Sequence, residues 1–576
     1  MGFLQPSPPP FDLDEWRAKP YLARLKANVQ EWAVNGFGAP GIVYALYAVK
    51  LIVFVAGAAI VISTTTRGTG GLGHIGSWWT MPVVFQKVAV WTLLWEIIGL
   101  GSGSMPLTGR FSPMIGGILY WLRPRTVRLP PWPDKVPLTE GYRRSRADVL
   151  LYSGVLASAT YLLVSRSPAS GRLQQLPIAI LLGFLVVLGL RDKVPFLAAR
   201  PEIYGFVLVV SLFPLRNMVA AWQFVMFFIW WGAATSKLNR HFPFVTSVML
   251  SNTPWNRSKR FKAKLYRNYP DDIRPSRLAA LAAHGGTVVE YSLPLIMLLA
   301  RGTTAQTLAI AGMVLFHVHI VSAFPLGVPL EWNLFMIFGI VFVFGHYGFV
   351  PLSGVDDPLL IAVLATIGVV IPVIGNLFPE KVSFLLSMRY YAGNWASSMW
   401  LFRKDTKAEE KLDTRVYKVA RIALEQLSTT YDPQMAEYVL ERGHAFRAMH
   451  SHGRALIALM ARAVIHVDDY DGRDGETIAG IVAGWNFGDG HFHDHRLLAA
   501  VQEQCGFIEG ELRVITLESQ PIHIPRQRYR IYDAASGLLE EGWVEVAEMV
   551  RRGPWLEESW SFPVEVTGGR SRAPVA

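Results

Sequence analysis

Ionisable side chains inside strongly apolar segments are the residues of this sequence whose positions most directly suggest chemistry. A charged group at the centre of a bilayer costs about 2.5–3.5 kcal/mol even on a permissive scale, so several of them imply buried pairs or a wet cavity. Ten such residues fall within or beside apolar runs: Lys50, Lys87, Glu96, Arg216, His284, Glu290, His317, His319, Glu331 and His346. We therefore expect a polar cavity, in which a lysine, a carboxylate and a histidine handle protons.

Helical spacing shows which of these residues can act together. His317 and His319 are two positions apart, about 200° around a helix, so they face opposite sides and cannot bind one metal ion. His284 and Glu290 are offset by about 240° on another predicted helix. The site must therefore be assembled between helices.

Lys237 ends a membrane-length apolar run that begins near Asn217. One interpretation is an anchor, whose stem lies along lipid while its ammonium reaches water. The other is a general base, because an amine in a low-dielectric pocket keeps a larger neutral fraction than an amine in water. The residues alone leave both interpretations open.

Composition and apolar runs predict a multispanning membrane protein. The 576 residues are 51% hydrophobic and 17% charged, with a mean hydropathy of +0.28, which is unusual for a soluble protein. Runs of about 18 apolar residues can cross the roughly 30 Å hydrocarbon core as helices, and we predict about 8–10 of them. The segments are 41–63, 81–100, 149–165, 176–190, one or two within 203–235, 278–300, 304–326, 332–349 and 358–378. The only cysteine, Cys505, excludes an intramolecular disulfide.

Charge is distributed unevenly along the chain. Residues 405–576 carry 19 basic and 27 acidic residues, which leaves a net +19 on residues 1–404. This basic excess lies around the spans and indicates orientation and contact with anionic membrane lipids, not nucleic-acid binding. The basic loops 102–148 and 237–277 predict a cell-membrane protein with both termini cytoplasmic. Segment 203–235 is then a helical hairpin with a short first arm, or alternatively a single crossing that violates the charge rule.

The predicted fold class is a polytopic α-helical membrane protein with a C-terminal soluble α+β domain. We assign residues 1–36 to a Pro-rich tail and an interfacial amphipathic segment, and residues 37–380 to the transmembrane domain. A basic interfacial connector follows at 381–404, then the soluble domain at 405–567 and a disordered tail at 568–576. The predicted helices of the soluble domain are 407–428, 433–463 and 494–504, and its predicted strands are 464–467, 512–517, 521–524, 528–532 and 542–548.

Three histidines alternate in the soluble domain. On a strand, His491, His493 and His495 would place their imidazoles on one face, which suits a divalent metal such as zinc or iron. The alternative is a polar Gly-rich loop with solvated histidines. The sequence leaves both open.

Three stretches, taken together, resemble a known family. They are 232–239 (Gly-Ala-Ala-Thr-Ser-Lys-Leu-Asn), 289–294 (Val-Glu-Tyr-Ser-Leu-Pro), and 317–324 followed by Leu334 and Phe335. Over roughly residues 148–378 the chain resembles the horizontally transferred transmembrane domain of vitamin K-dependent gamma-carboxylases and their bacterial relatives. It also resembles a group of uncharacterised actinobacterial membrane proteins of similar length.

The resemblance to gamma-carboxylases implies specific roles. Lys237 matches the base that initiates hydroquinone oxygenation, Glu290 and Pro294 match the next helix, and His317 or His319 matches the third. The chain departs from the gamma-carboxylase pattern in two respects. The carboxylases carry a large lumenal β-rich domain, whereas this C-terminal domain is smaller and acidic. Their lysine also works toward the outer side, whereas Lys237 is predicted at the inner face.

The leading functional hypothesis is a protein that binds or modifies a lipid-soluble substrate, a quinone or an isoprenoid lipid, by acid-base chemistry. A menaquinone-type quinone is the expected cofactor, and membrane lipids and other membrane proteins are the expected partners. The residues expected to contact substrate are Glu96, Trp231, Asn239, His284, Glu331 and His346. The contrasting hypothesis is a transporter or an assembly subunit without enzymatic activity.

Overall fold

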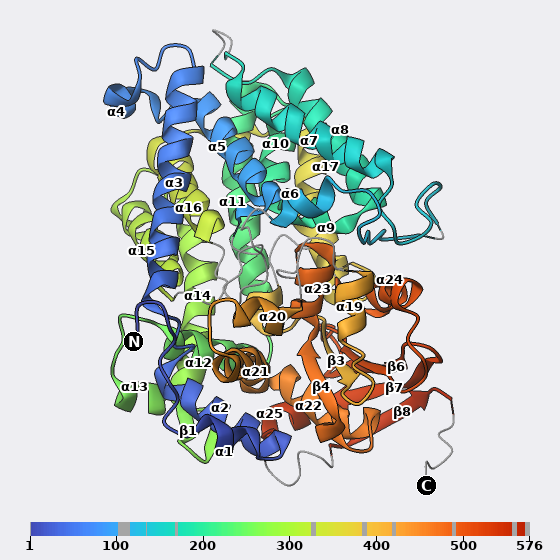
Figure 1. Cartoon of the computed structure of the whole chain (residues 1–576). Coiled ribbons are helices and arrows are strands. Elements are labelled where there is room, and N and C mark those ends of the chain that lie inside the picture. Colours follow the sequence, from blue (N-terminus) through green and yellow to red (C-terminus); the bar gives the residue numbers. More distant parts are fainter. Residues whose placement is uncertain are drawn as a thin grey trace.

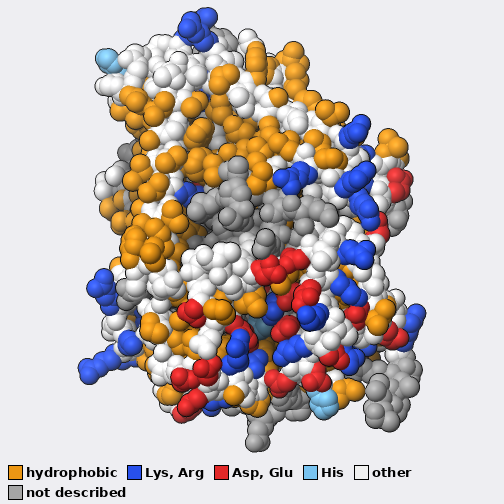
Figure 2. Space-filling view, in the orientation of Figure 1, with side chains coloured by type: hydrophobic (Ala, Val, Ile, Leu, Met, Phe, Trp, Pro, Cys, Tyr) orange, Lys and Arg blue, Asp and Glu red, His pale blue; other side chains and the backbone are white. Residues whose placement is uncertain are grey.

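The computed structural model describes residues 2–101, 116–133, 135–166, 171–323, 330–382, 389–416, 422–485, 491–555 and 562–570. A bundle of long helices forms one end of the molecule, and a sheet with shorter helices forms the other (Figure 1). Hydrophobic side chains cover much of the visible surface of the bundle, whereas acidic and basic side chains gather over the sheet end (Figure 2). The predicted disordered tail falls largely on residues 571–576, which lie outside the described residues.

Apolar helices confirm the predicted membrane fold. Among the described residues, seven are long enough to span a bilayer: α3 (Gly41–Thr65), α5 with η2 (Pro82–Leu100), α7 (Arg146–Val164), α11 (Leu215–Ser236), α14 (Arg277–Leu299), α15 (Thr304–Ser322), and α17 to α18 (Pro358–Leu377). Three shorter ones are α8 (Gln175–Arg191), η3 with α10 (Pro201–Val210), and α16 with η4 (Leu330–His346). The chain turns before Pro214, so segment 203–235 has the short first arm predicted for a hairpin.

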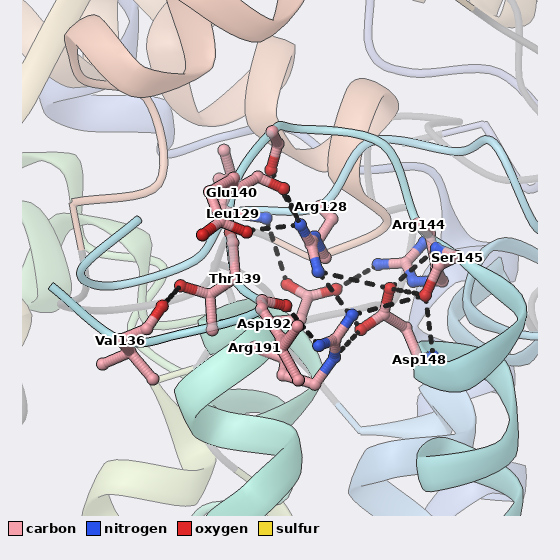
Figure 3. A network of polar contacts seen from close by, with 12 residues as sticks. Arg128, Leu129, Val136, Thr139, Glu140, Arg144, Ser145, Asp148, Arg191 and Asp192 are labelled. Carbon is pink, nitrogen blue, oxygen red and sulfur yellow. Dashed lines mark hydrogen bonds and ion pairs between the residues drawn. The ribbon is translucent and has the colours of Figure 1, made fainter. Parts of the chain in front are cut away.

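A buried ion-pair network fixes the ends of α7 and α8 (Figure 3). Asp148 lies in the capping box of α7 and pairs with Arg128 at 3.4 Å and with Arg191 at 2.5 Å. Arg144 pairs with Asp192 nearby. Arg128 and Arg144 belong to the basic loop 102–148, so these two charges serve internal packing and are not available to lipid headgroups.

The C-terminal region contains an antiparallel six-stranded sheet in the order β4-β3-β5-β6-β7-β8. Its strands are β3 (Ser397–Arg403), β4 (Tyr470–Asp474), β5 (Leu512–Leu517), β6 (Arg526–Asp533), β7 (Gly537–Glu545) and β8 (Val564–Gly568). The strands predicted at 512–517 and 528–532 are confirmed, and 542–548 overlaps the end of β7. Those predicted at 464–467 and 521–524 are wrong, because both segments are turns or irregular chain. Strand β3 lies inside the segment predicted as a connector.

Helices flank this sheet. They include α19 (Glu410–Arg415), α20 (Ala423–Ser428), α21 (Pro433–Met449), α22 (Ser451–Ala463), α23 (Gly475–Ala483), α24 (His495–Cys505) and α25 (Val546–Arg551). The single helix predicted over 433–463 is broken at His450, whose backbone is extended with φ −91° and ψ 146°. The helix predicted at 494–504 is confirmed by α24, which Asp494 caps at its N-terminus.

The two ends of the molecule share their apolar core. One cluster of buried side chains runs from Val83 and Trp222 in the bundle to Trp400 and Val514 in the sheet. The C-terminal region is therefore packed onto the membrane helices.

The amphipathic N-terminal segment takes a different place from the one predicted. Helix α2 (Tyr21–Asn35) packs against α21, and its Leu25, Val29 and Trp32 belong to the same buried cluster as Ile515 of the sheet. Its apolar face is therefore buried in protein and not available to the membrane surface. An amphipathic helix suits either environment, so the pattern could not decide between them.

Candidate functional site

A buried ion pair joins the two residues on which the sequence argument depended most. Lys237 is the C-terminal cap of α11, and its ammonium contacts the carboxylate of Glu290 in the middle of α14. Lys237 is 9% exposed and Glu290 4%. The ammonium also lies 5.4 Å and 5.9 Å from the ring centroids of Phe242 and Phe316, in cation–π range. In this structure Lys237 is therefore an inward-facing group and not an anchor in lipid.

His317 lies beside this pair with both ring nitrogens engaged. The indole Nε1–H of Trp230 donates to His317 Nε2 at 2.9 Å, and His317 Nδ1 lies 2.7 Å from Asn333 Oδ1. Because an indole only donates, Nε2 must be the acceptor, and the ring proton resides on Nδ1 and is donated to the amide oxygen. With both nitrogens occupied, the neutral ring is suited to positioning neighbouring groups and not to accepting a proton from a ligand.

A cavity of about 270 Å³ lies next to the ion pair, between α11, α12 (Phe242–Asn252), α14, α15 and α16. Its wall is mainly apolar and includes Ile229, Phe242, Met249, Leu250, Phe316 and Met336. Its polar groups are Lys237, Glu290, His317, His319, Asn333 and Thr246. An apolar pocket with a few convergent polar groups is typical of small-molecule sites.

The cavity reaches the outer surface of the helix bundle. Ala282 of α14 and His319 of α15 both line it and are exposed. The neighbouring outward-facing residues are apolar, including Leu281 at 72% exposure and Leu315 at 67%. Since α14 and α15 are both candidate spans, this opening faces the region that lipid would occupy.

Three of the predicted residues form a second buried polar cluster on another side of α16. Lys50 of α3 pairs with Glu331 at 2.5 Å, and Trp95 donates to the same carboxylate at 3.2 Å. Glu96 is 1% exposed, and neither of its oxygens has a hydrogen-bond partner in the part of the chain that the structure describes. Glu96 and Glu331 do not line the cavity.

The remaining residues predicted to contact substrate lie outside the cavity lining. Trp231 donates to the backbone oxygen of Tyr291 at 3.1 Å. His284 is exposed on α14, and His346 is exposed beside Trp79. Asn239 stabilises the turn before α12, because its Oδ1 accepts from the backbone N–H groups of residues 241 and 242 at 2.8 and 2.9 Å. None of these four residues lines the cavity.

One residue that follows the membrane helices also lines the cavity, and hydrogen bonds to the C-terminal region lie nearby; the sequence argument singled out neither. Tyr391 lines the cavity, and Asn394 exchanges hydrogen bonds of 2.9 and 2.6 Å with the backbone of Gln520. His241 joins Ser451 at 2.7 Å and Gln520 at 3.0 Å, and burial lowers the pKa of this imidazole to about 4. No periodic pattern connects these residues. Asn333, which also lines the cavity, could have been noticed in the sequence because it is an amide within an apolar run.

The alternating histidines lie where a turn leads into α24, so of the two alternatives the strand is wrong. They border one polar pocket of about 70 Å³. Each ring has its own partner: His491 with Glu518 at 2.8 Å, His493 with Ser398 at 2.9 Å, and His495 with the ring of Tyr532 at 6.1 Å. Among the described residues, no group of three His, Cys, Asp or Glu side chains is placed to hold one metal ion.

The fold and the site define a multi-pass helical membrane protein with a buried ion pair beside an apolar cavity. The chain belongs to the family described as "Transmembrane protein of unknown function (DUF3556)", which matches residues 1–567. No curated protein and no solved structure matches the chain.

Proposed function

We propose that the protein binds a lipid-soluble molecule with a polar head, of the quinone or isoprenoid class, in the cavity between α11, α12, α14, α15 and α16. One observation carries this proposal: an apolar cavity ends at a buried ion pair and also opens between two candidate spans. A ligand dissolved in the bilayer could enter sideways through that opening. Its head would meet Lys237 and Glu290, and its apolar part would lie against Met249 and Phe316.

The ion pair supports acid-base chemistry on such a ligand. With the shared proton on Lys237, the Glu290 carboxylate is the group able to accept a proton from a quinol-type hydroxyl. The Lys237 ammonium then stabilises the oxyanion that forms. The resemblance to gamma-carboxylases supports the same two positions, although there the lysine is the base. A menaquinone-type quinone is the cofactor that this chemistry favours.

A pair of neighbouring glycines on α14 provides a direct test. Gly286 lines the cavity, whereas Gly285 is exposed outside it, and a Cβ added at either position meets no atom within 4 Å. Both changes to leucine raise helix propensity similarly. We expect Gly286→Leu to lose the co-purifying quinone or isoprenoid found by lipid extraction and mass spectrometry, and Gly285→Leu to retain it. Absence of any stoichiometric lipid from the wild-type protein would reject the proposal.

The alternative, a transporter or an assembly subunit, is favoured by one observation. The cluster of Lys50, Glu96 and Glu331 places further charges inside the bundle, close to the cavity but on another side of α16. Buried ionisable groups of this kind also mark proton paths. Proton flux in proteoliposomes that Glu96→Gln abolishes, without any bound quinone or isoprenoid, would favour this alternative.

A further inference from the structure

A basic and aromatic segment, residues 253–268, lies beside the opening of the cavity. It contains the short helix α13 (Lys259–Ala263) and five exposed cations, Arg257, Lys259, Arg260, Lys264 and Arg267. No Asp or Glu occurs from residue 203 to residue 270. Within the described residues, none of these five cations forms an ion pair, whereas many other basic residues do. The segment therefore presents uncompensated positive charge.

The position of the segment is fixed by its first aromatic residue. Trp255 is 61% exposed, donates from Nε1 to Ser322 Oγ at 2.8 Å, and packs edge-on against His319. Ser322 is the last residue of candidate span α15, and His319 lines the cavity. Trp255 thus lies at the end of a span, directly beside the opening.

Exposed aromatic side chains lie among the exposed basic ones along this segment. Phe261 is 39% exposed next to Arg260, and the adjoining span α14 begins at Arg277 with exposed Leu278 and Leu281. Figure 1 shows α13 at the lower left, below α14 and α15, and Figure 2 shows basic side chains projecting from that edge. Tryptophan at the end of a span and basic residues next to it are typical of the headgroup level of a bilayer.

We propose that residues 253–268 bind the phosphate headgroups of anionic phospholipids at the bilayer surface, next to the opening of the cavity. Arginine and lysine hydrogen-bond and pair with phosphate oxygens, and the indole of Trp255 lies at the depth where headgroup and acyl chain meet. The location at the end of two candidate spans favours a lipid over a soluble polyanion. This inference does not depend on a ligand in the cavity, because the cations lie outside it.

The test compares two lipids and two charge variants of the full-length protein in detergent. Phosphatidylglycerol and phosphatidylcholine with identical acyl chains are titrated, and bound lipid is measured by native mass spectrometry. Each cation near an anionic headgroup contributes about fivefold to binding. We therefore expect Lys259→Gln/Arg260→Gln to weaken phosphatidylglycerol binding about 25-fold and to leave phosphatidylcholine binding unchanged.

The matched control is Lys19→Gln/Arg570→Gln, which removes the same charge. Both residues are exposed: Lys19 lies just after α1 (Leu13–Arg17) and Arg570 just after β8, so neither belongs to residues 253–268 (Figure 1). The control should bind both lipids as the wild type does, and both variants should keep the wild-type unfolding temperature. Equal binding of the two lipids by the wild type, or equal losses in the two folded variants, would overturn the proposal.

Discussion

Replacing either member of the Lys237–Glu290 pair alone should destabilise the protein far more than replacing both. Removing one partner leaves the other charge buried and uncompensated, which costs about 3–5 kcal/mol. That range applies because the two residues are only 9% and 4% exposed. Replacing both with apolar residues of similar volume is often neutral or stabilising, by about 1–4 kcal/mol. We expect Lys237→Met and Glu290→Leu each to lose about 3–5 kcal/mol, and the double variant to recover most of that loss.

The assay is denaturant unfolding of detergent-solubilised protein, followed by tryptophan fluorescence. The pair Lys407–Glu410 serves as a matched control, because its atoms are 3.5 Å apart but its side chains are 74% and 61% exposed. Its single variants, Lys407→Met and Glu410→Leu, should each cost less than about 1 kcal/mol and add in the double variant. Additive losses at Lys237 and Glu290 would refute the buried ion pair. Loss of lipid by the stable double variant would separately support a role of the pair in binding.

Three further predictions concern residues around the site and the C-terminal region. Asn239→Ala should lower the unfolding free energy by about 1 kcal/mol, because it removes the two hydrogen bonds that hold the turn before α12. Arg447→Met should cost about 3–5 kcal/mol in the same denaturant titration, because Arg447 pairs with buried Asp474. Burial lowers the pKa of His241 and of His493 to about 4, below the ordinary 6.5. The unfolded chain therefore binds more protons between those values, so stability should be complete above pH 6.5. It should fall by about 3 kcal/mol per histidine as the pH drops to 4, and His493→Gln should reduce that slope.

The spans could be predicted because a bilayer imposes length and apolarity on every crossing helix, and both are readable in a single segment. The participation of Lys237 and Glu290 in one site was also predictable, since neither charge is tolerated in hydrocarbon alone. The tautomer of His317 was not, because it depends on Trp230 and Asn333, which two other helices supply.

Strand β3 shows a second limit of sequence reasoning. Met399 and Leu401 face one buried cluster while Trp400 and Phe402 face the other, so the strand is apolar on both sides and lacks the alternation that reveals a strand with one face in water. The packing of helix α2 against α21 was not predictable for a related reason. Its amphipathic pattern indicates that one face of the helix must be covered, but it does not indicate whether protein or membrane covers that face.

The contact between α2 and α21 has a consequence for synthesis. Arg24 of α2 hydrogen-bonds Glu441 of α21, 417 residues later in the chain. At about 5–20 residues per second, α2 leaves the ribosome roughly 20–80 seconds before its partner exists. During that interval Leu25, Val29 and Trp32 have no native surface to cover them, while the intervening helices are being inserted. The growing chain must keep α2 from aggregating, and a lipid surface or a chaperone could hold it transiently until α21 emerges.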